Sequence, residues 1–324
     1  MTKRSIFIIF FFLPLLVRSD RTLNTFTIFQ ISGPESFAFE LTGHGPYSGL
    51  SDGRIIKYQG PEIGFVDFAY TSPNRTKEKY DGTNDPELGP ICGRPLGLGF
   101  NYRTEELYIV DVYLGLFKVG PKGGLAKQLA TAAEGVPFKW LDGLDVDSRT
   151  GMVYFTDIST KYTMRDLKTV IRIRDSTGRF MSYNPKTNEV KVLLRGLQGP
   201  GGAGVGRESS FVLVPECIGN RLSTYWLKGP KTNKTELIMS IPGPTNIKRT
   251  LSDDFWIAST INLQEPAPLA IPRGVKVDEF GNVLQVLNLA GIYNNSAIIE
   301  VQEFGDSYYI GSAFLSFAAS SKIC

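Results

Sequence analysis

The chain has 324 residues, of which 42% are hydrophobic and 21% are charged, the composition of an ordinary globular protein with a large core. Its formal net charge is only +3, and no run of Lys and Arg exceeds two residues, so a nucleic-acid partner is not expected. The single histidine, His44, excludes catalytic sites that need a His triad or paired histidines.

The first 19 residues have the pattern of a secretory signal peptide. Lys3 and Arg4 precede an apolar run over residues 6–17, and Ser19 is a small residue suited to cleavage. The run is short for a bilayer span, although an uncleaved anchor is the alternative. No other long apolar run follows. Residues 20–324 are therefore expected to form one domain without a membrane span, located in the endoplasmic reticulum lumen, the vacuole or outside the cell.

One pattern recurs along the chain, in which a turn with Asp, Ser or Gly leads into an apolar strand. Its six copies lie at residues 45–48, 107–111, 153–157, 211–216, 255–259 and 308–312. Their mean spacing of roughly 53 residues is within the range of propeller blades. The pattern predicts an all-β fold, a single six-bladed β-propeller whose closure removes exposed sheet edges. Residues 25–31 are expected to add a strand to the last blade, and residues 126–133 are the best candidate for a short helix.

Three Asn-X-Ser/Thr sequons begin at Asn74, Asn233 and Asn294, each in a polar, turn-like stretch. Together with the leader they predict a glycoprotein.

The cysteines are Cys92, Cys217 and Cys324, an odd number that leaves at least one thiol free or intermolecular in a secreted protein. They are too sparse for a metal cluster, and Cys92 and Cys217 are expected to be small core residues.

Several segments carry a family resemblance. They include Asp52-Gly-Arg-Ile-Ile-Lys-Tyr at 52–58, Gly-Val-Pro-Phe-Lys-Trp-Leu at 135–141, Arg-Thr-Gly-Met-Val-Tyr-Phe-Thr-Asp at 149–157 and Asn-Ile-Lys-Arg at 246–249. These stretches resemble the strictosidine synthases of plants, and the likeness covers most of residues 20–324. The resemblance implies a six-bladed β-propeller on the secretory route, often vacuolar. It also implies an alkaloid-forming condensation of an amine with an aldehyde.

The residue that performs this condensation is replaced. Residues 298–311 resemble the catalytic segment of the family, whose essential glutamate stands three residues before the Gln-Glu pair. Ile299 occupies that position, and an isoleucine has no titratable group for acid–base chemistry. Glu300 is adjacent, but neighbouring side chains on a strand face opposite ways, so Glu300 is expected to point into the blade or across it. By the same resemblance, Ala297 and Ile298 replace a His-Phe pair and Asp142 replaces a pocket tyrosine.

A wider likeness is to paraoxonase-like and regucalcin-like hydrolases, which share the six-bladed fold and hold Ca²⁺ or another divalent ion with oxygen ligands. The matching positions are Glu35, Asp142, Gly201, Thr245 and Asn246. Glu35, Asp142 and Asn246 are the candidate metal ligands, whereas Gly201 has no side chain and Thr245 stands where those enzymes place aspartate. Glu35 and Asp142 are expected to point into one central cavity. As alternatives, they share a proton or serve only a turn and a loop cap.

Three functions stay open. In the first, a pocket at one end of the channel, lined by Glu35, Phe138, Trp140, Asp142, Asn246 and Ile299, binds or turns over a small plant metabolite and needs no cofactor. In the second, a divalent ion such as Ca²⁺ assists hydrolysis of an ester or lactone. In the third, the propeller is a non-catalytic scaffold.

Overall fold

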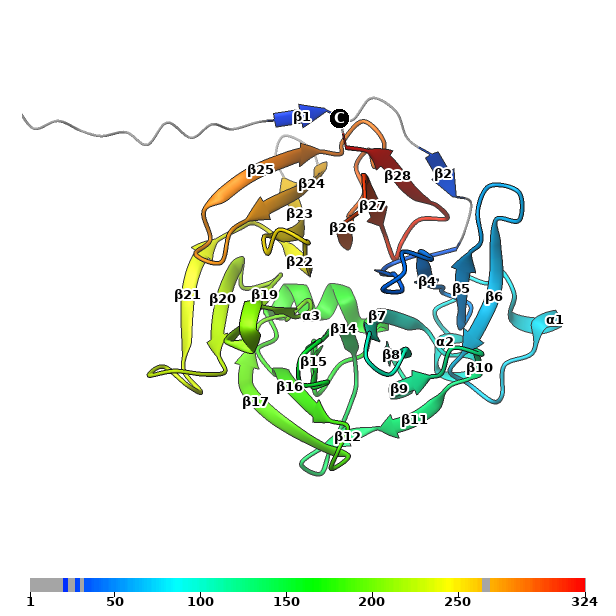
Figure 1. Ribbon diagram of the computed structural model, residues 1–324, viewed down its shortest axis with the longest axis horizontal. Coiled ribbons are helices and arrows are strands. Elements are labelled where there is room, and N and C mark those ends of the chain that lie inside the picture. The colour runs from blue at the N-terminus through cyan, green and yellow to red at the C-terminus, as the bar shows by residue number, and fades with distance from the viewer. Residues whose placement is uncertain (1–19, 23–26, 30–31, 264–268, 324) are drawn as a thin grey trace, which may run out of the picture.

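Six antiparallel sheets stand around a central axis in the computed structural model, which describes residues 20–22, 27–29, 32–263 and 269–323 (Figure 1). The predicted six-bladed β-propeller is therefore confirmed. The expected signal peptide and Cys324 lie outside the described residues.

Each blade has four main strands. From the channel outward, the first three blades consist of β3 (Phe37–Ala38), β4 (Tyr47–Gly49), β5 (Arg54–Tyr58) and β6 (Phe65–Tyr70); β7 (Pro95–Asn101), β8 (Glu106–Asp111), β9 (Gly115–Val119) and β11 (Lys127–Ala130); and β14 (Leu141–Val146), β15 (Val153–Asp157), β16 (Gly178–Asn184) and β17 (Glu189–Leu197). The last three consist of β18 (Gly204–Val205), β19 (Phe211–Glu216), β20 (Arg221–Trp226) and β21 (Thr235–Ser240); β22 (Pro244–Arg249), β23 (Phe255–Leu263), β24 (Leu269–Val277) and β25 (Val283–Asn288); and β26 (Glu300–Phe304), β27 (Ser307–Gly311), β28 (Ala318–Lys322) and β2 (Thr27–Phe29). All six repeat copies fall on the second strand of a blade.

The ring closes as predicted, because β2 pairs antiparallel with β28 and completes the last blade, with Ile28 opposite Ala319. Two further strands widen other blades: β1 (Asp20–Thr22) pairs with β25, and β10 (Gly124–Leu125) pairs with β6, both in parallel. The helix expected over residues 126–133 is wrong. That segment forms β11 and then β12 (Ala132–Ala133), which pairs with β13 (Val136–Pro137), because pairing of β11 with β9 overrides a weak helical pattern.

The core is a ring of apolar clusters, one between each pair of neighbouring blades. Between the second and third blades, for example, Tyr108 and Val110 pack against Leu144 and Phe155. A further cluster, containing Leu96, Trp140 and Val170, lies at one end of the ring.

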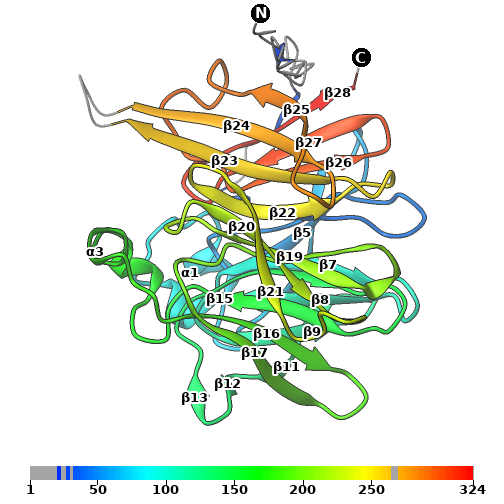
Figure 2. The same ribbon diagram turned by 90° about the vertical axis from the view of Figure 1, so that its left-hand side faces the viewer.

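The helices are short and lie outside the blades. They are α1 (Lys77–Tyr80), α2 (Gly89–Cys92), α3 (Leu167–Ile173) and the 3₁₀ turns η1 (Met164–Asp166) and η2 (Arg207–Ser209). A capping box of Thr163 and Asp166 starts the η1–α3 segment, which projects from one end of the ring (Figure 2). No helix among the described residues is long and apolar enough to cross a membrane.

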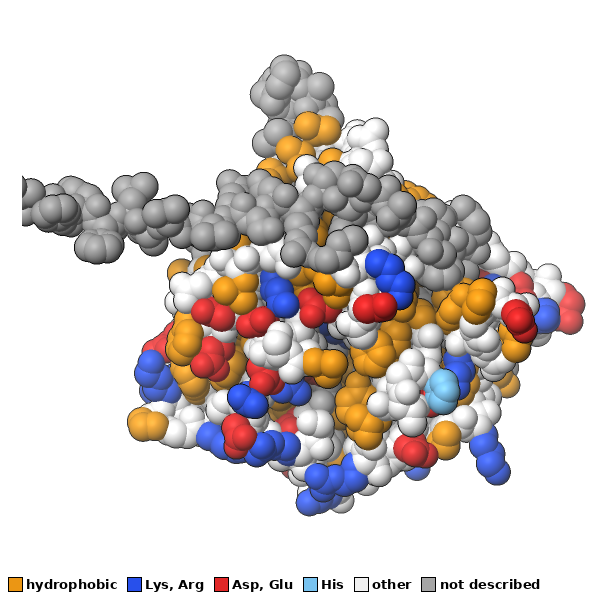
Figure 3. All heavy atoms as spheres, turned by 45° about the horizontal axis from the view of Figure 1, so that its top comes forward, with side chains coloured by type: hydrophobic (Ala, Val, Ile, Leu, Met, Phe, Trp, Pro, Cys, Tyr) orange, Lys and Arg blue, Asp and Glu red, His pale blue; other side chains and the backbone are white. Residues whose placement is uncertain are grey.

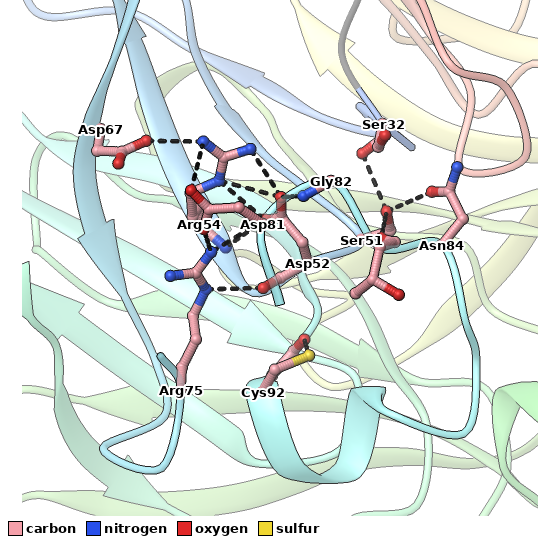
Figure 4. A network of polar contacts seen from close by, with 12 residues as sticks. Ser32, Ser51, Asp52, Arg54, Asp67, Arg75, Asp81, Gly82, Asn84 and Cys92 are labelled. Atoms are coloured by element: carbon pink, nitrogen blue, oxygen red, sulfur yellow. Dashed lines mark hydrogen bonds and ion pairs between the residues drawn. The ribbon is translucent and has the colours of Figure 1, made fainter. Parts of the chain in front are cut away.

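A buried ionic network fixes the long connection after β6 to the first blade (Figure 4). The Asp52 carboxylate is fully buried and accepts hydrogen bonds from Arg54 Nη2 (2.7 Å) and from the backbone N–H of Gly82 (2.8 Å). Arg75 Nε donates to the Asp52 carbonyl (2.8 Å) and its guanidinium pairs with Asp81. The segment that carries α1 is thereby held against β5.

Candidate functional site

A cavity of about 820 Å³ opens at the end of the ring that carries α3. Its walls are mainly apolar, with Leu96, Trp140, Ile158, Leu167, Ile241 and Ile299 among them. The volume lies in the range of roughly 300–1,000 Å³ that is usual for small-molecule sites.

Two carboxyl groups belong to the polar part of this wall. Glu35 precedes β3 and is 1% exposed, and Asp142 stands in β14. Burial raises the pKa of Glu35 well above its usual range, and the Asp142 carboxyl raises it further, while the Arg94 guanidinium opposes the shift. Burial, followed by the charge of Glu300, likewise raises the pKa of Asp142. At neutral pH this pair therefore retains a proton.

Glu300 is a third buried carboxyl group, in the channel beneath the cavity. It faces away from the cavity wall but crosses to the first blade, where its Oε1 accepts a hydrogen bond from the backbone N–H of Phe37 (2.7 Å). Lys248 Nζ lies 3.5 Å from Glu300 Oε2 and donates to the carbonyl of Leu98 (3.2 Å). Burial raises the pKa of Glu300, and the Lys248 ammonium partly offsets this. Sequence analysis did not identify Lys248 as part of the site.

Asn246 lies on β22 between Asp142 and Glu300 rather than on the cavity wall. In one orientation of its amide, Nδ2 donates to Glu300 Oε2 (3.3 Å). In the other, the nitrogen donates to the carbonyl of Gly201 and to Asp142 Oδ2 (3.2 Å). Asn246 therefore donates to one or the other of two buried carboxyl groups, depending on the orientation of its amide.

Three polar atoms of the cavity lining are buried without a hydrogen-bond partner: Glu35 Oε1, Trp140 Nε1 and Thr260 Oγ1. Their residues come from a loop before the first blade, from the third blade and from the fifth, and so line the cavity from different sides. A buried polar atom left without a partner costs about 1–3 kcal/mol. A ligand with suitably placed polar groups would remove this cost.

The structure places Ile299 and Phe138, two residues predicted to line the pocket, in different surroundings. Ile299 lines the cavity, as expected. Phe138 does not, and its assignment to the pocket is wrong: its ring packs edge-to-face on Phe155, with centroids 5.8 Å apart, in the core between the second and third blades. The chain bends at Lys139, between Phe138 and Trp140, so these two side chains do not share a face.

Only some of the positions that match the metal ligands of the hydrolases could hold a metal ion here. Within the part of the chain that the structure describes, no three His, Cys, Asp or Glu side chains are arranged to hold one. The hydroxyl of Thr245 donates to the carbonyl of Ile299 (2.9 Å). At Gly201 a Cβ would lie 2.8 Å from the carbonyl oxygen of Thr245, so no ligating side chain fits there. Glu35 and Asp142 remain, with Asn246 nearby.

Of the cysteines and sequon asparagines that the structure describes, Cys217 alone lines the cavity. Cys92 is a free, buried thiol, and Cys217 is a free thiol on the cavity wall. Burial and the nearby Asp142 raise the pKa of Cys217 to about 12, so it stays protonated. Asn74, Asn233 and Asn294 are all exposed, as glycan acceptors must be.

Comparisons with known proteins agree on one family. Residues 142–230 match the family model described as strictosidine synthase. The strictosidine synthase of Catharanthus roseus is 43% identical over 286 residues, which cover 87% of this chain and 81% of that protein. STRICTOSIDINE SYNTHASE-LIKE 12 of Arabidopsis thaliana is 42% identical over 295 residues, 90% of this chain and 87% of that protein.

Solved structures show the same architecture at low sequence identity. A gluconolactonase from Xanthomonas campestris is 11% identical with a TM-score of 0.63, covering 90% of this chain and 87% of that chain. A calcium-binding regucalcin from Agrobacterium tumefaciens is 10% identical with a TM-score of 0.62, covering 93% of this chain and 94% of that chain. These two likenesses show the fold alone.

Proposed function

Because this chain belongs to the strictosidine synthase family, we propose that its end cavity binds a small, largely apolar molecule without performing the amine–aldehyde condensation. One observation carries the proposal: an apolar cavity of about 820 Å³ is lined by three residues that each have a buried polar atom without a partner. Such atoms are rare in folded proteins and call for an explanation. A bound ligand supplies one.

The chemistry of these atoms restricts the ligand. Trp140 Nε1 is only a donor, so it requires a hydrogen-bond acceptor on the ligand. Thr260 Oγ1 donates or accepts, and so does Glu35 while it holds a proton. A carbonyl, ether or hydroxyl oxygen satisfies all three. The proposed ligand is therefore an apolar skeleton carrying two or more oxygen functions, a common composition among plant metabolites.

Condensation is not proposed because the cavity wall lacks a base at the required place. Ile299 stands there, and Ala297 beside it is equally inert. The carboxyl groups of the cavity wall, Glu35 and Asp142, come from the loop before the first blade and from the third blade, and they do not stand at the Ile299 position.

Binding of the neutral dye Nile red, followed by fluorescence, tests the proposal. Ala297 lines the cavity, so Ala297→Trp should fill part of it and weaken dye binding at least tenfold. Ala132, which is also half-buried but lies in β12, provides the matched control Ala132→Trp. Fractions of plant metabolites that displace the dye from the wild type would then contain the ligand. Equal dye binding by the wild type and Ala297→Trp contradicts the proposal.

A divalent-metal-assisted hydrolase of esters or lactones is the second candidate, supported by the unpartnered Glu35 Oε1 beside Asp142. The two carboxylates would hold the ion, and the ion would polarise a substrate carbonyl. Thermal melting in calcium and in chelator tests this. A rise in Tm with calcium that is lost in Glu35→Gln supports the metal-assisted hydrolase. If calcium does not change the Tm of the wild type, this candidate function is excluded.

A further inference from the structure

We propose that the mouth of the cavity docks on an anionic lipid bilayer. The first evidence is a group of large apolar side chains exposed at the mouth. Ile171 and Ile173 of α3 are 53% and 47% exposed, and Phe314, after β27, is 52% exposed. Ile171 and Phe314 also line the cavity, so this apolar rim is continuous with its apolar wall.

The same segment is strongly basic. Residues 161–174 contain Lys161, Arg165, Lys168, Arg172 and Arg174 but a single acidic residue, Asp166. The carboxylate of that aspartate accepts hydrogen bonds from Thr163 within the capping box.

Most of this positive charge is not neutralised by the protein. Arg165 pairs with Glu87, and Arg174 donates to Gln198 and to the carbonyl of Ile218. Among the described residues, no ion pair is formed by Lys161, Lys168 or Arg172. Lys168 and Arg172 are one helical turn apart and flank Ile171, so apolar and basic groups share the outer face of α3.

An outer face of this kind fits a lipid surface. Branched side chains enter the boundary between headgroups and acyl chains, while Lys and Arg remain with the anionic headgroups. A second copy of this chain is disfavoured, because it would bring two basic segments together.

The opposite end of the ring has no such separation of charge. There, acidic, basic and apolar side chains are intermixed (Figure 3). Arg149 pairs with Glu208, and Arg249 pairs with Asp253. Docking through α3 would therefore orient the cavity toward the bilayer, from which an apolar ligand enters without crossing water. The inference does not depend on which ligand the cavity takes.

Flotation with vesicles tests the inference on the full chain. The wild type should float with vesicles of phosphatidylcholine mixed with phosphatidylglycerol, should bind vesicles of phosphatidylcholine alone much less, and should dissociate as salt rises. Removing each basic residue should weaken binding about fivefold, so Lys168→Glu with Arg172→Glu should weaken it roughly 25-fold or more. Ile171→Ser with Ile173→Ser should also release the protein.

The controls are exposed residues elsewhere. Lys186→Glu with Lys191→Glu, on the hairpin of β16 and β17, changes the net charge as much as Lys168→Glu with Arg172→Glu does. Leu251→Ser removes an apolar side chain that is 88% exposed. Both should bind like the wild type. The proposal is overturned by a wild type that does not float with anionic vesicles, by equal losses in the controls, or by α3 variants that alter only self-association in sedimentation.

Discussion

At the scale of single residues, the buried carboxyl groups determine how stability depends on pH. The pKa values of Glu35 and Asp142 are raised in the folded protein, so the folded state binds more protons than the unfolded state above pH of about 4. Their contribution to stability is complete below that pH and is lost as the pH rises through the raised values. A tenfold change in the acidity of one such group corresponds to about 1.4 kcal/mol of stability.

Urea unfolding over a series of pH values should therefore show the free energy of unfolding falling from acid toward neutral and alkaline pH. Asp142→Asn keeps the shape of the side chain but cannot ionise. It should flatten this fall and be more stable than the wild type at alkaline pH. A slope identical to that of the wild type would show that Asp142 does not titrate in this range.

Ile299 gives the second prediction at this scale. Incubation of the wild type with tryptamine and secologanin should yield no condensation product above background, because loss of a general base costs roughly 10²–10⁴ in rate. Ile299→Glu alone should recover little, since Ala297 and Asp142 also differ from the family pattern. Product analysis by liquid chromatography checks both proteins, and robust turnover by the wild type refutes the argument.

The residues that line the cavity could be predicted from the sequence better than the contacts in the channel below it. Glu35 and Asp142 were expected to face one cavity, and both line it. Glu300 was expected to point into the blade or across it. Strand alternation did not reveal that the Glu300 side chain reaches into the channel. There the backbone N–H of Phe37, in the neighbouring blade, donates a hydrogen bond to it. That contact joins residues far apart in the chain, which no local pattern reports.

At the scale of elements, strands were predictable and their connections were not. The second strand of each blade is an apolar run after a turn, and every such copy was identified. The connection after β6 is held by ion pairs and backbone contacts rather than by a buried apolar face (Figure 4). Its sequence therefore shows no periodic pattern of apolar residues.

The Asp52 network tests this view of the connection. Asp52→Ala removes the buried carboxylate that pairs with Arg54 and Arg75 and leaves the Gly82 N–H without its acceptor, so it should cost about 3–5 kcal/mol in urea unfolding. Asp67→Ala is the matched control, because Asp67 pairs with the same Arg54 (3.0 Å) but its side chain is 51% exposed. The control should cost less than about 1 kcal/mol. Equal losses would mean that burial does not decide the strength of this pair.

At the scale of the whole molecule, repeat spacing was enough to predict the ring, and β2 closes it. Entry into the secretory pathway stays a prediction, supported here by the exposure of all three sequon asparagines.

Expression in plant cells should give a glycoprotein whose gel mobility increases after glycosidase treatment. Thr76→Ala and Thr235→Ala each remove one sequon while leaving its asparagine in place, which matters at Asn233 because its Oδ1 accepts a hydrogen bond from Tyr225 (3.0 Å). Each variant should migrate as if it had lost one glycan. An unchanged mobility together with an intact N-terminus would contradict secretion.

The cavity at the α3 end of the ring should hold a small oxygenated ligand. A crystal structure of the protein after incubation with a plant metabolite fraction that displaces Nile red tests it most directly. We expect density for one molecule inside the cavity, with an acceptor near Trp140 Nε1 and polar contacts to Glu35 and Thr260. An empty cavity, or density only on the outer surface, would contradict it.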